Sequence, residues 1–74
     1  MLYVKFQNEI MVHKAEVRKI GRDVVAVKMD VMQPNTSGFR VYLDKAGTKM
    51  IGDYSKYKKV LGEPGAYGIA YTKN

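Results

Sequence analysis

Residues 21–31 read GRDVVAVKMDV, a short polar turn followed by a run of apolar residues. Every second residue of the run, from Val25 to Val31, is large and apolar, which is the period of a strand that buries one face. Gly21 tolerates a positive φ without steric cost, so we expect residues 21–23 to form a tight hairpin turn. We predict a strand over residues 24–31 with these side chains in the core: Val25, Val27, Met29 and Val31.

The segment before this turn, residues 10–20, has apolar residues whose parity changes twice. A regular strand keeps its apolar side chains on alternate positions, so we expect β-bulges near His13 and Arg18 that return them to the inner face. The β-branched residues of the segment favour this strand. A short helix within residues 11–19 is the alternative. The apolar residues in question are Ile10, Val12, Ala15, Val17 and Ile20.

A second hairpin is predicted around residues 45–48, a stretch that contains Gly47. Before it, residues 39–44 alternate in the manner of a strand, and three apolar side chains share the face that we expect in the core. Met50 or Ile51, at the start of the return strand, should lie opposite that face. The three inward side chains are Phe39, Val41 and Leu43.

The remaining segments complete an all-β pattern. Residues 2–6 and 67–71 alternate as short strands, residues 32–38 break the pattern as the longest loop, and residues 57–61 fit either a strand or a helix. About six short strands joined mainly by hairpins predict an all-β fold, a small antiparallel barrel or sandwich with at most one short helix. Because no repeat or linker interrupts the 74 residues, we expect a single domain over residues 1–74.

Composition narrows the classes of function. The chain has 13 Lys and Arg against 7 Asp and Glu, a formal charge of +6, with no Cys and one His. Without Cys there is no disulfide, zinc knuckle or thiol nucleophile, and His13 alone cannot assemble a transition-metal site. No apolar run approaches the roughly 20 residues that span a bilayer, and no stretch resembles a signal peptide. We therefore expect no metal, no cofactor and no membrane segment.

Residues suited to catalysis are few. His13 is the only side chain whose ordinary pKa fits acid–base catalysis near neutral pH, and no nucleophile motif accompanies it. A carboxylate pair for glycoside cleavage needs a sugar-sized cleft, which a chain of this length makes doubtful. We therefore expect no catalytic residue and no enzymatic activity. The carboxylates considered, all near predicted strand ends, are Asp23, Asp30, Asp44 and Asp53.

Basic and aromatic residues gather in residues 54–59, which read YSKYKK. Single-stranded nucleic-acid grooves combine rings that stack on bases with amines that follow the phosphates, and small β-barrels often present them. Nucleic-acid binding is therefore our alternative function. The competing interpretation is a solvated lysine surface with tyrosine rings half in the core. The predicted nucleic-acid-binding residues are Tyr54, Lys56, Tyr57, Lys58 and Lys59.

Four other tyrosines fall at alternating strand positions. Exposed tyrosine is enriched at protein interfaces, and a partly open barrel leaves strand edges that can dock a partner or a second copy. We therefore predict a protein partner or self-association. In the competing interpretation the ring is buried and only its hydroxyl reaches solvent. The predicted interaction residues are Tyr3, Tyr42, Tyr67 and Tyr71.

Two segments of the chain carry a resemblance to known proteins: TSGFRVYLD, residues 36–44, and IGDYSKY, residues 51–57. Together they resemble a hairpin found in small bacteriophage and prophage proteins of Gram-positive bacteria, in which Ser-Gly-Phe, a turn and Gly-Asp-Tyr-Ser recur. The resemblance implies a structural or assembly role near phage tail genes, in the virion or the host cytoplasm. It implies no chemistry. Those proteins carry an acidic residue and Thr where this chain has lysines 56, 58 and 59, so the resemblance does not extend to the basic cluster.

The same hairpin residues also have structural explanations. Gly38 and Gly52 allow a positive φ or a β-bulge at either end of the hairpin. Asp53 can accept backbone N–H groups and fix the exit of the strand. Taken together, the sequence predicts a non-enzymatic phage or prophage β module with a structural or protein-interaction role, and nucleic-acid binding as the alternative.

Overall fold

The computed structural model describes residues 2–7, 9–32 and 37–72, without the side chains of residues 37 and 59–61. These residues contain six strands and no helix, so the part of the chain described has no helix long and apolar enough to cross a membrane. The strands are β1 Leu2–Phe6, β2 Val12–Lys19, β3 Val24–Met29, β4 Ser37–Tyr42, β5 Met50–Leu61 and β6 Tyr67–Thr72.

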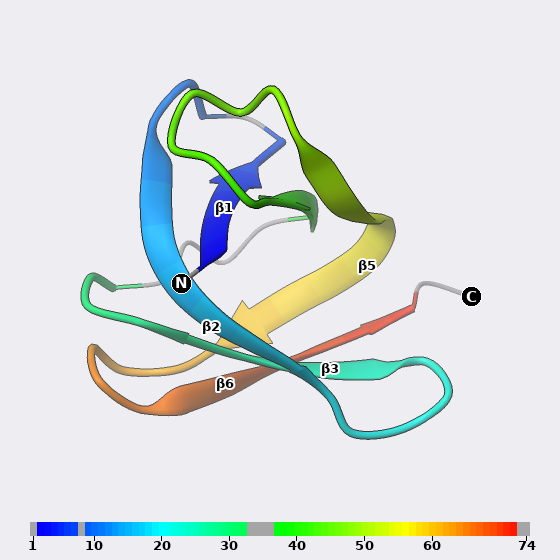
Figure 1. Cartoon of the computed structure of the whole chain (residues 1–74). Coiled ribbons are helices and arrows are strands. Elements are labelled where there is room, and N and C mark those ends of the chain that lie inside the picture. Colours follow the sequence, from blue (N-terminus) through cyan, green and yellow to red (C-terminus); the bar gives the residue numbers. More distant parts are fainter. Residues whose placement is uncertain (1, 8, 33–36, 73–74) are drawn as a thin grey trace.

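The six strands form a ring in the order β1-β2-β3-β6-β5-β4, and β4 pairs back onto β1 (Figure 1). All pairs are antiparallel, so the prediction of a small all-β antiparallel barrel is confirmed. The ring is irregular, because the β4–β5 and β5–β6 ladders contain register shifts. Each of these six strands has two neighbours, which leaves no free edge strand for the edge docking predicted from a partly open barrel.

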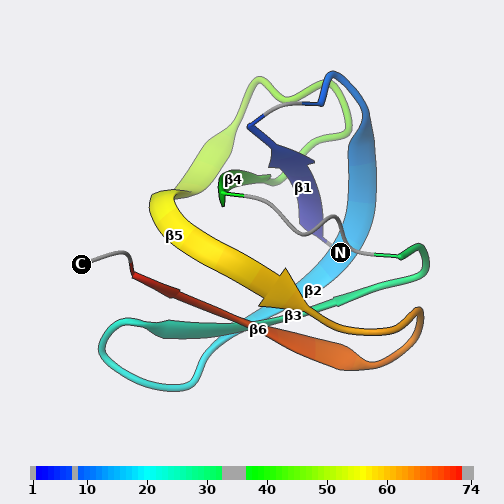
Figure 2. The same cartoon turned by 180° about the vertical axis from the view of Figure 1, so that it is seen from behind.

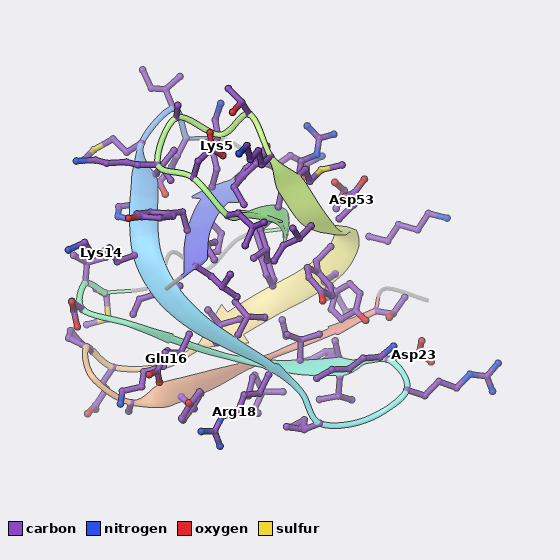
Figure 3. The ribbon with its side chains drawn as sticks, in the orientation of Figure 1. Lys5, Lys14, Glu16, Arg18, Asp23 and Asp53 are labelled. Carbon is purple, nitrogen blue, oxygen red and sulfur yellow. The ribbon has the colours of Figure 1, made fainter. Side chains whose placement is uncertain are left out.

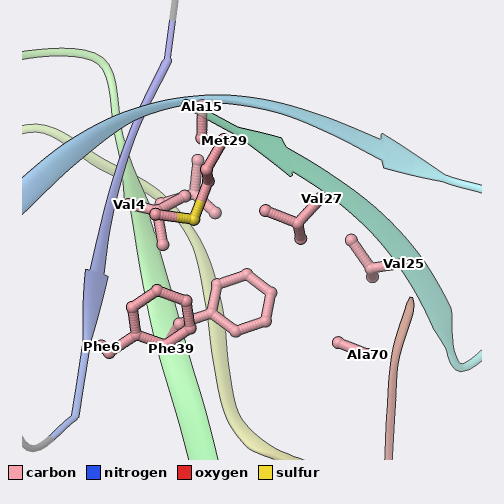
Figure 4. Close-up of a cluster of buried hydrophobic side chains, with 9 residues drawn as sticks. Val4, Phe6, Ala15, Val25, Val27, Met29, Phe39 and Ala70 are labelled. Atoms are coloured by element: carbon pink, nitrogen blue, oxygen red, sulfur yellow. The ribbon is translucent and has the colours of Figure 1, made fainter. Parts of the chain in front are cut away.

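The core lies inside the ring and is built from alternate residues of its strands (Figure 4). Val4 and Phe6 of β1 stand opposite Val41 and Phe39 of β4, so all four side chains enter the same interior. The rings of Phe6 and Phe39 lie 5.8 Å apart between centroids. The predicted inward residues of β3 are confirmed as far as the strand extends: Val25, Val27 and Met29.

β2 is a regular strand, so the predicted bulges and the alternative helix are both wrong. Its pairing with β1 and with β3 runs without a register shift. The inward position opposite Val4 is taken by His13, a polar residue that makes the apolar pattern look broken. Ile10 and Ile20 lie beyond the strand ends, and Ile10 is 91% exposed.

Two strands end earlier than predicted. Val31 and Leu43 lie past the ends of β3 and β4 and are exposed, Leu43 to 53%. Residues 43–49 form a wider turn than the one predicted, in which the Asp44 carboxylate accepts the backbone N–H of Thr48 and of Lys49 at 2.9 and 2.8 Å. Consequently the residues opposite Phe39 and Val41 are Tyr54 and Gly52, and not the exposed Met50 or Ile51.

Glycine geometry at the hairpins is partly as expected. The tight turn predicted at residues 21–23 is confirmed, because Ile20 and Gly21 both donate N–H bonds to the Val24 carbonyl, although Gly21 is not among the described glycines with a positive φ. Gly38 has a φ of 54° and lies beside the predicted bulge. A Cβ there would lie 2.5 Å from the Ser55 carbonyl oxygen, so β4 and β5 approach too closely for any other residue.

The first prediction compares two glycines. Gly65→Ala, with a φ of 82° and no atom within 4 Å of the added Cβ, should lower the free energy of unfolding by only about 1–2 kcal/mol, the cost of the left-handed backbone. Gly38→Ala adds overpacking against Ser55 and should lower it by about 2–5 kcal/mol. Urea unfolding of both variants measures the difference. Equal losses would contradict the close approach of β4 and β5.

Candidate binding face

β5 carries the predicted tyrosine–lysine cluster and bends along its length (Figure 1). Between the Phe39–Tyr54 pair and the Ser37–Lys58 pair, β4 advances by two residues and β5 by four. The extra residues allow Tyr54 and Tyr57, which a regular strand would place on opposite faces, both to pack against the core. Tyr54 stacks on Phe39 at 5.1 Å between centroids and meets Tyr57 edge-on at 5.0 Å.

Lys56 and Lys58 of the cluster point away from the core. Lys56 and Lys58 are exposed, and Lys58 pairs with Tyr71 of β6, which is also exposed. The side chain of Lys59 lies outside the described part of the structure. The structure therefore separates the predicted nucleic-acid-binding residues, with the two rings half-buried and two of the amines in solvent.

Two of the four predicted interaction tyrosines are available to a partner. Tyr42 is only 8% exposed, because the turn of residues 43–49 folds back so that Gly47 lies over its ring. Tyr3 is half-buried on β1. Tyr67 and Tyr71 are 37% and 36% exposed on the outer side of β6.

The outer side of β6 joins the outer sides of its neighbours into one surface, which we call the β6 face. Lys28 of β3 pairs with Tyr67, and Lys58 of β5 pairs with Tyr71. Arg18 extends outward from β2 (Figure 3), with its guanidinium carbon 5.4 Å from the centroid of the Tyr67 ring, and the Lys28 amine lies 5.7 Å from the same ring. The β6 face is defined by Arg18, Lys28, Lys58, Tyr67, Ile69 and Tyr71, with Glu16 beside it.

Glu16 holds the Tyr67 ring in place. The Tyr67 hydroxyl donates a hydrogen bond of 2.9 Å to Glu16 Oε2, and the Lys28 amine lies 3.8 Å from the same oxygen. The hydrogen bond and the nearby cations lower the pKa of Glu16, so its carboxylate stays charged under acidic conditions that protonate an ordinary glutamate. The same hydrogen bond raises the pKa of Tyr67, because an ionised phenolate has no proton to donate and would face a carboxylate.

The second prediction follows from this pair. Glu16→Ala removes both the acceptor and the charge, so the pKa of Tyr67 should fall toward the ordinary tyrosine value. An NMR titration to alkaline pH, which follows the chemical shift of a Tyr67 ring carbon, measures this fall in pKa. Glu63→Ala, which removes an exposed carboxylate elsewhere, is the matched control and should leave the pKa of Tyr67 unchanged. If the pKa of Tyr67 is the same in Glu16→Ala as in the wild type, the hydrogen bond between Tyr67 and Glu16 is contradicted.

Two other acidic residues, Asp44 and Asp53, have local structural contacts. Asp53 accepts the backbone N–H of Ser55 at 3.0 Å and its hydroxyl at 2.5 Å, as predicted, and the hydroxyl bond lowers the pKa of Asp53. The Thr48 hydroxyl likewise lowers the pKa of Asp44. Within the described ranges, no group of three or more His, Cys, Asp or Glu is placed to hold a metal ion.

The hollows on the described part of the structure considered as ligand sites are small. Two shallow hollows of about 180 and 230 Å³ lie along β2 and share Lys14 and Asp30. Ligand pockets usually enclose about 300–1,000 Å³. His13 lines the larger hollow, with its Nε2 3.5 Å from a Glu9 carboxylate oxygen.

Comparison with known proteins gives no relative: no family model, no curated protein and no solved structure matches the chain. Function must therefore be inferred from the side chains. Sequence reasoning missed Arg18 and Lys28, because their position beside Tyr67 depends on the registers that join β2, β3 and β6. One feature of the sequence did point to this surface. Lys28 alternates with the core residues of its strand, and Tyr67 and Tyr71 share one face of theirs, so all three could be expected to point outward.

Proposed function

We propose that the chain is a non-enzymatic binding module that engages a macromolecular partner through the β6 face. The observation that carries the proposal is the pair of exposed rings, Tyr67 and Tyr71, set among Arg18, Lys28 and Lys58 on the outside of the ring. Tyrosine and arginine are enriched at the centres of interfaces, where a rigid ring supplies contact area at little entropic cost.

A face suits this fold better than an edge or a cleft. Because the described strands all pair on both sides, a partner cannot add a strand to the sheet through them. The hollows along β2 are too small to surround most ligands. The outer side of the ring is made of strands that are paired on both sides, and it offers a surface for contact with a large partner.

The resemblance to phage and prophage proteins supports a biological setting for this module. We propose a structural or protein-interaction role in the virion or the host cytoplasm, with association to a phage tail as its most specific form. The resembling residues build the core and the β4–β5 turn, as Phe39, Tyr54 and Asp44 do. They support a shared architecture, whereas the β6 face is formed by other residues. Nucleic-acid binding is the second candidate function, favoured by cations placed beside exposed rings.

The third prediction tests the face. Immobilised wild-type protein should retain material from purified virions and from induced lysogens of a Gram-positive host, and Tyr67→Leu/Tyr71→Leu should retain less than about a tenth of it, as expected when two interface anchors are lost. Tyr3→Leu, a tyrosine outside the β6 face, is the matched control and should behave as wild type. Each capture is repeated after nuclease treatment, which separates protein partners from nucleic acid. Equal capture by all three proteins would exclude the β6 face as the binding surface.

A further inference from the structure

We infer that the partner of the β6 face is a single-stranded nucleic acid, an inference that rests on the proposed function of that face. Three features of the described residues point to it: the sign of the charge on the outer surface, the availability of ring faces, and the contacts of the Glu16 carboxylate.

Cations dominate the outer surface around β6. The outward residues of β2, β3 and β6 and of residues 56–58 include five cations and one carboxylate, Glu16. Two further carboxylates, Asp23 and Asp30, lie just beyond the ends of β3, and Asp30 lines the same hollow as Lys14, Glu16 and Lys28, so the cations still outnumber the carboxylates. A surface of this sign attracts a polyanion, and each phosphate that pairs with a lysine or arginine releases condensed counterions. The five cations are Lys14, Arg18, Lys28, Lys56 and Lys58.

Glu16 does not oppose this attraction strongly. Its carboxylate accepts a hydrogen bond from the Tyr67 hydroxyl and lies 3.8 Å from the Lys28 amine, so it offsets part of the charge of that one lysine and leaves the cations in excess. The same contacts fix the tilt of the Tyr67 ring. The carboxylate therefore acts as a positioning group for an aromatic side chain and leaves the face open to an anion.

Ring faces distinguish a single strand from other polyanions. Tyr71 is exposed, and none of the ring or cation contacts of the described residues covers it. Tyr67 lies four residues away on the same side of the strand, roughly 13 Å along it. Next to Tyr67, the Arg18 guanidinium adds a second planar group on which a base can stack.

Unpaired bases can use such surfaces, whereas a duplex hides its base faces in its own stack. An acidic protein would use the cations and could pack side chains on the rings, but a single strand offers a planar base to each ring along its length. The combination on the β6 face therefore favours single-stranded DNA or RNA over a duplex and over an acidic polypeptide. Sequence preference is expected to be weak, because stacking accepts every base.

The fourth prediction uses fluorescence anisotropy with labelled single strands of mixed sequence, about 15 nucleotides long, as DNA and as RNA. Wild-type protein should bind both more tightly than the matching duplex. Tyr71→Leu, which keeps an apolar side chain but removes the ring, should weaken binding by roughly 5- to 150-fold and leave the salt dependence unchanged.

Lysine variants test the phosphate contacts separately. Lys28→Gln/Lys58→Gln should weaken binding and reduce the slope of log K against log salt by about 1.4, the value for two single-strand phosphate contacts. The matched control is Lys5→Gln/Lys49→Gln, which makes the same change in charge away from the β6 face and should alter the slope by less than half as much. Circular dichroism and urea unfolding of each variant confirm that it folds.

Three other outcomes would overturn the inference, and they can be told apart. Tighter binding to polyglutamate than to the single strands, with no loss in Tyr71→Leu, would identify an acidic protein as the partner. In that case capture in the preceding experiment should survive nuclease, and the proposed function would stand. Absence of oligonucleotide binding at low salt would overturn the inference alone. If Tyr67→Leu/Tyr71→Leu also captures as wild type does, the proposed function fails as well.

Discussion

The contact between Phe39 and Tyr54 is the interaction on which the rest of the structure depends. The two rings lie opposite each other in the β4–β5 ladder and stack at 5.1 Å between centroids. Directly after this pair the β4–β5 register shifts; β5 still pairs with β4 at Lys58, and from Tyr57 onward it also pairs with β6 (Figure 2). Gly38, beside the stacked pair, has no side chain and so permits the Ser55 backbone to come close. Without this bend, the 12 residues of β5 could not pair with β4 at one end and with β6 at the other.

The bend also sorts the side chains of β5. It turns Tyr54 and Tyr57 into the interior, where they extend the aromatic core begun by Phe6 and Phe39. It leaves Lys58 on the outside, opposite Tyr71. The tyrosine–lysine cluster of residues 54–59 therefore places its two rings against the core and the amines of Lys56 and Lys58 at the surface. The exposed rings of the β6 face come from the last strand instead.

Local periodicity was enough to predict the strands with uninterrupted alternation. The inward residues of β3 followed from a period of two, and so did Phe39 and Val41 of β4. β2 was misjudged because an inward position carries His13, and the end of β4 was misjudged because the Asp44 carboxylate binds the turn that follows. Tyr67 and Tyr71 were predicted as interaction residues from their alternation, but the groups that surround Tyr67 could not be predicted, since Tyr67 and its partner Glu16 are separated by 51 positions in the sequence. Their meeting depends on the β2–β3 and β3–β6 pairings, which no local pattern encodes.

The most direct test of this account is an amide NMR titration of the labelled protein with an unlabelled single-stranded oligonucleotide at near-physiological salt. We expect the shift changes to concentrate on Arg18, Lys28, Lys58 and residues 67–71, with smaller changes at Tyr54 and Tyr57, whose rings face the core. Changes centred on Tyr54 and Tyr57 would mean that these rings turn outward to bind. That result would contradict both the inward packing of β5 and the assignment of the β6 face.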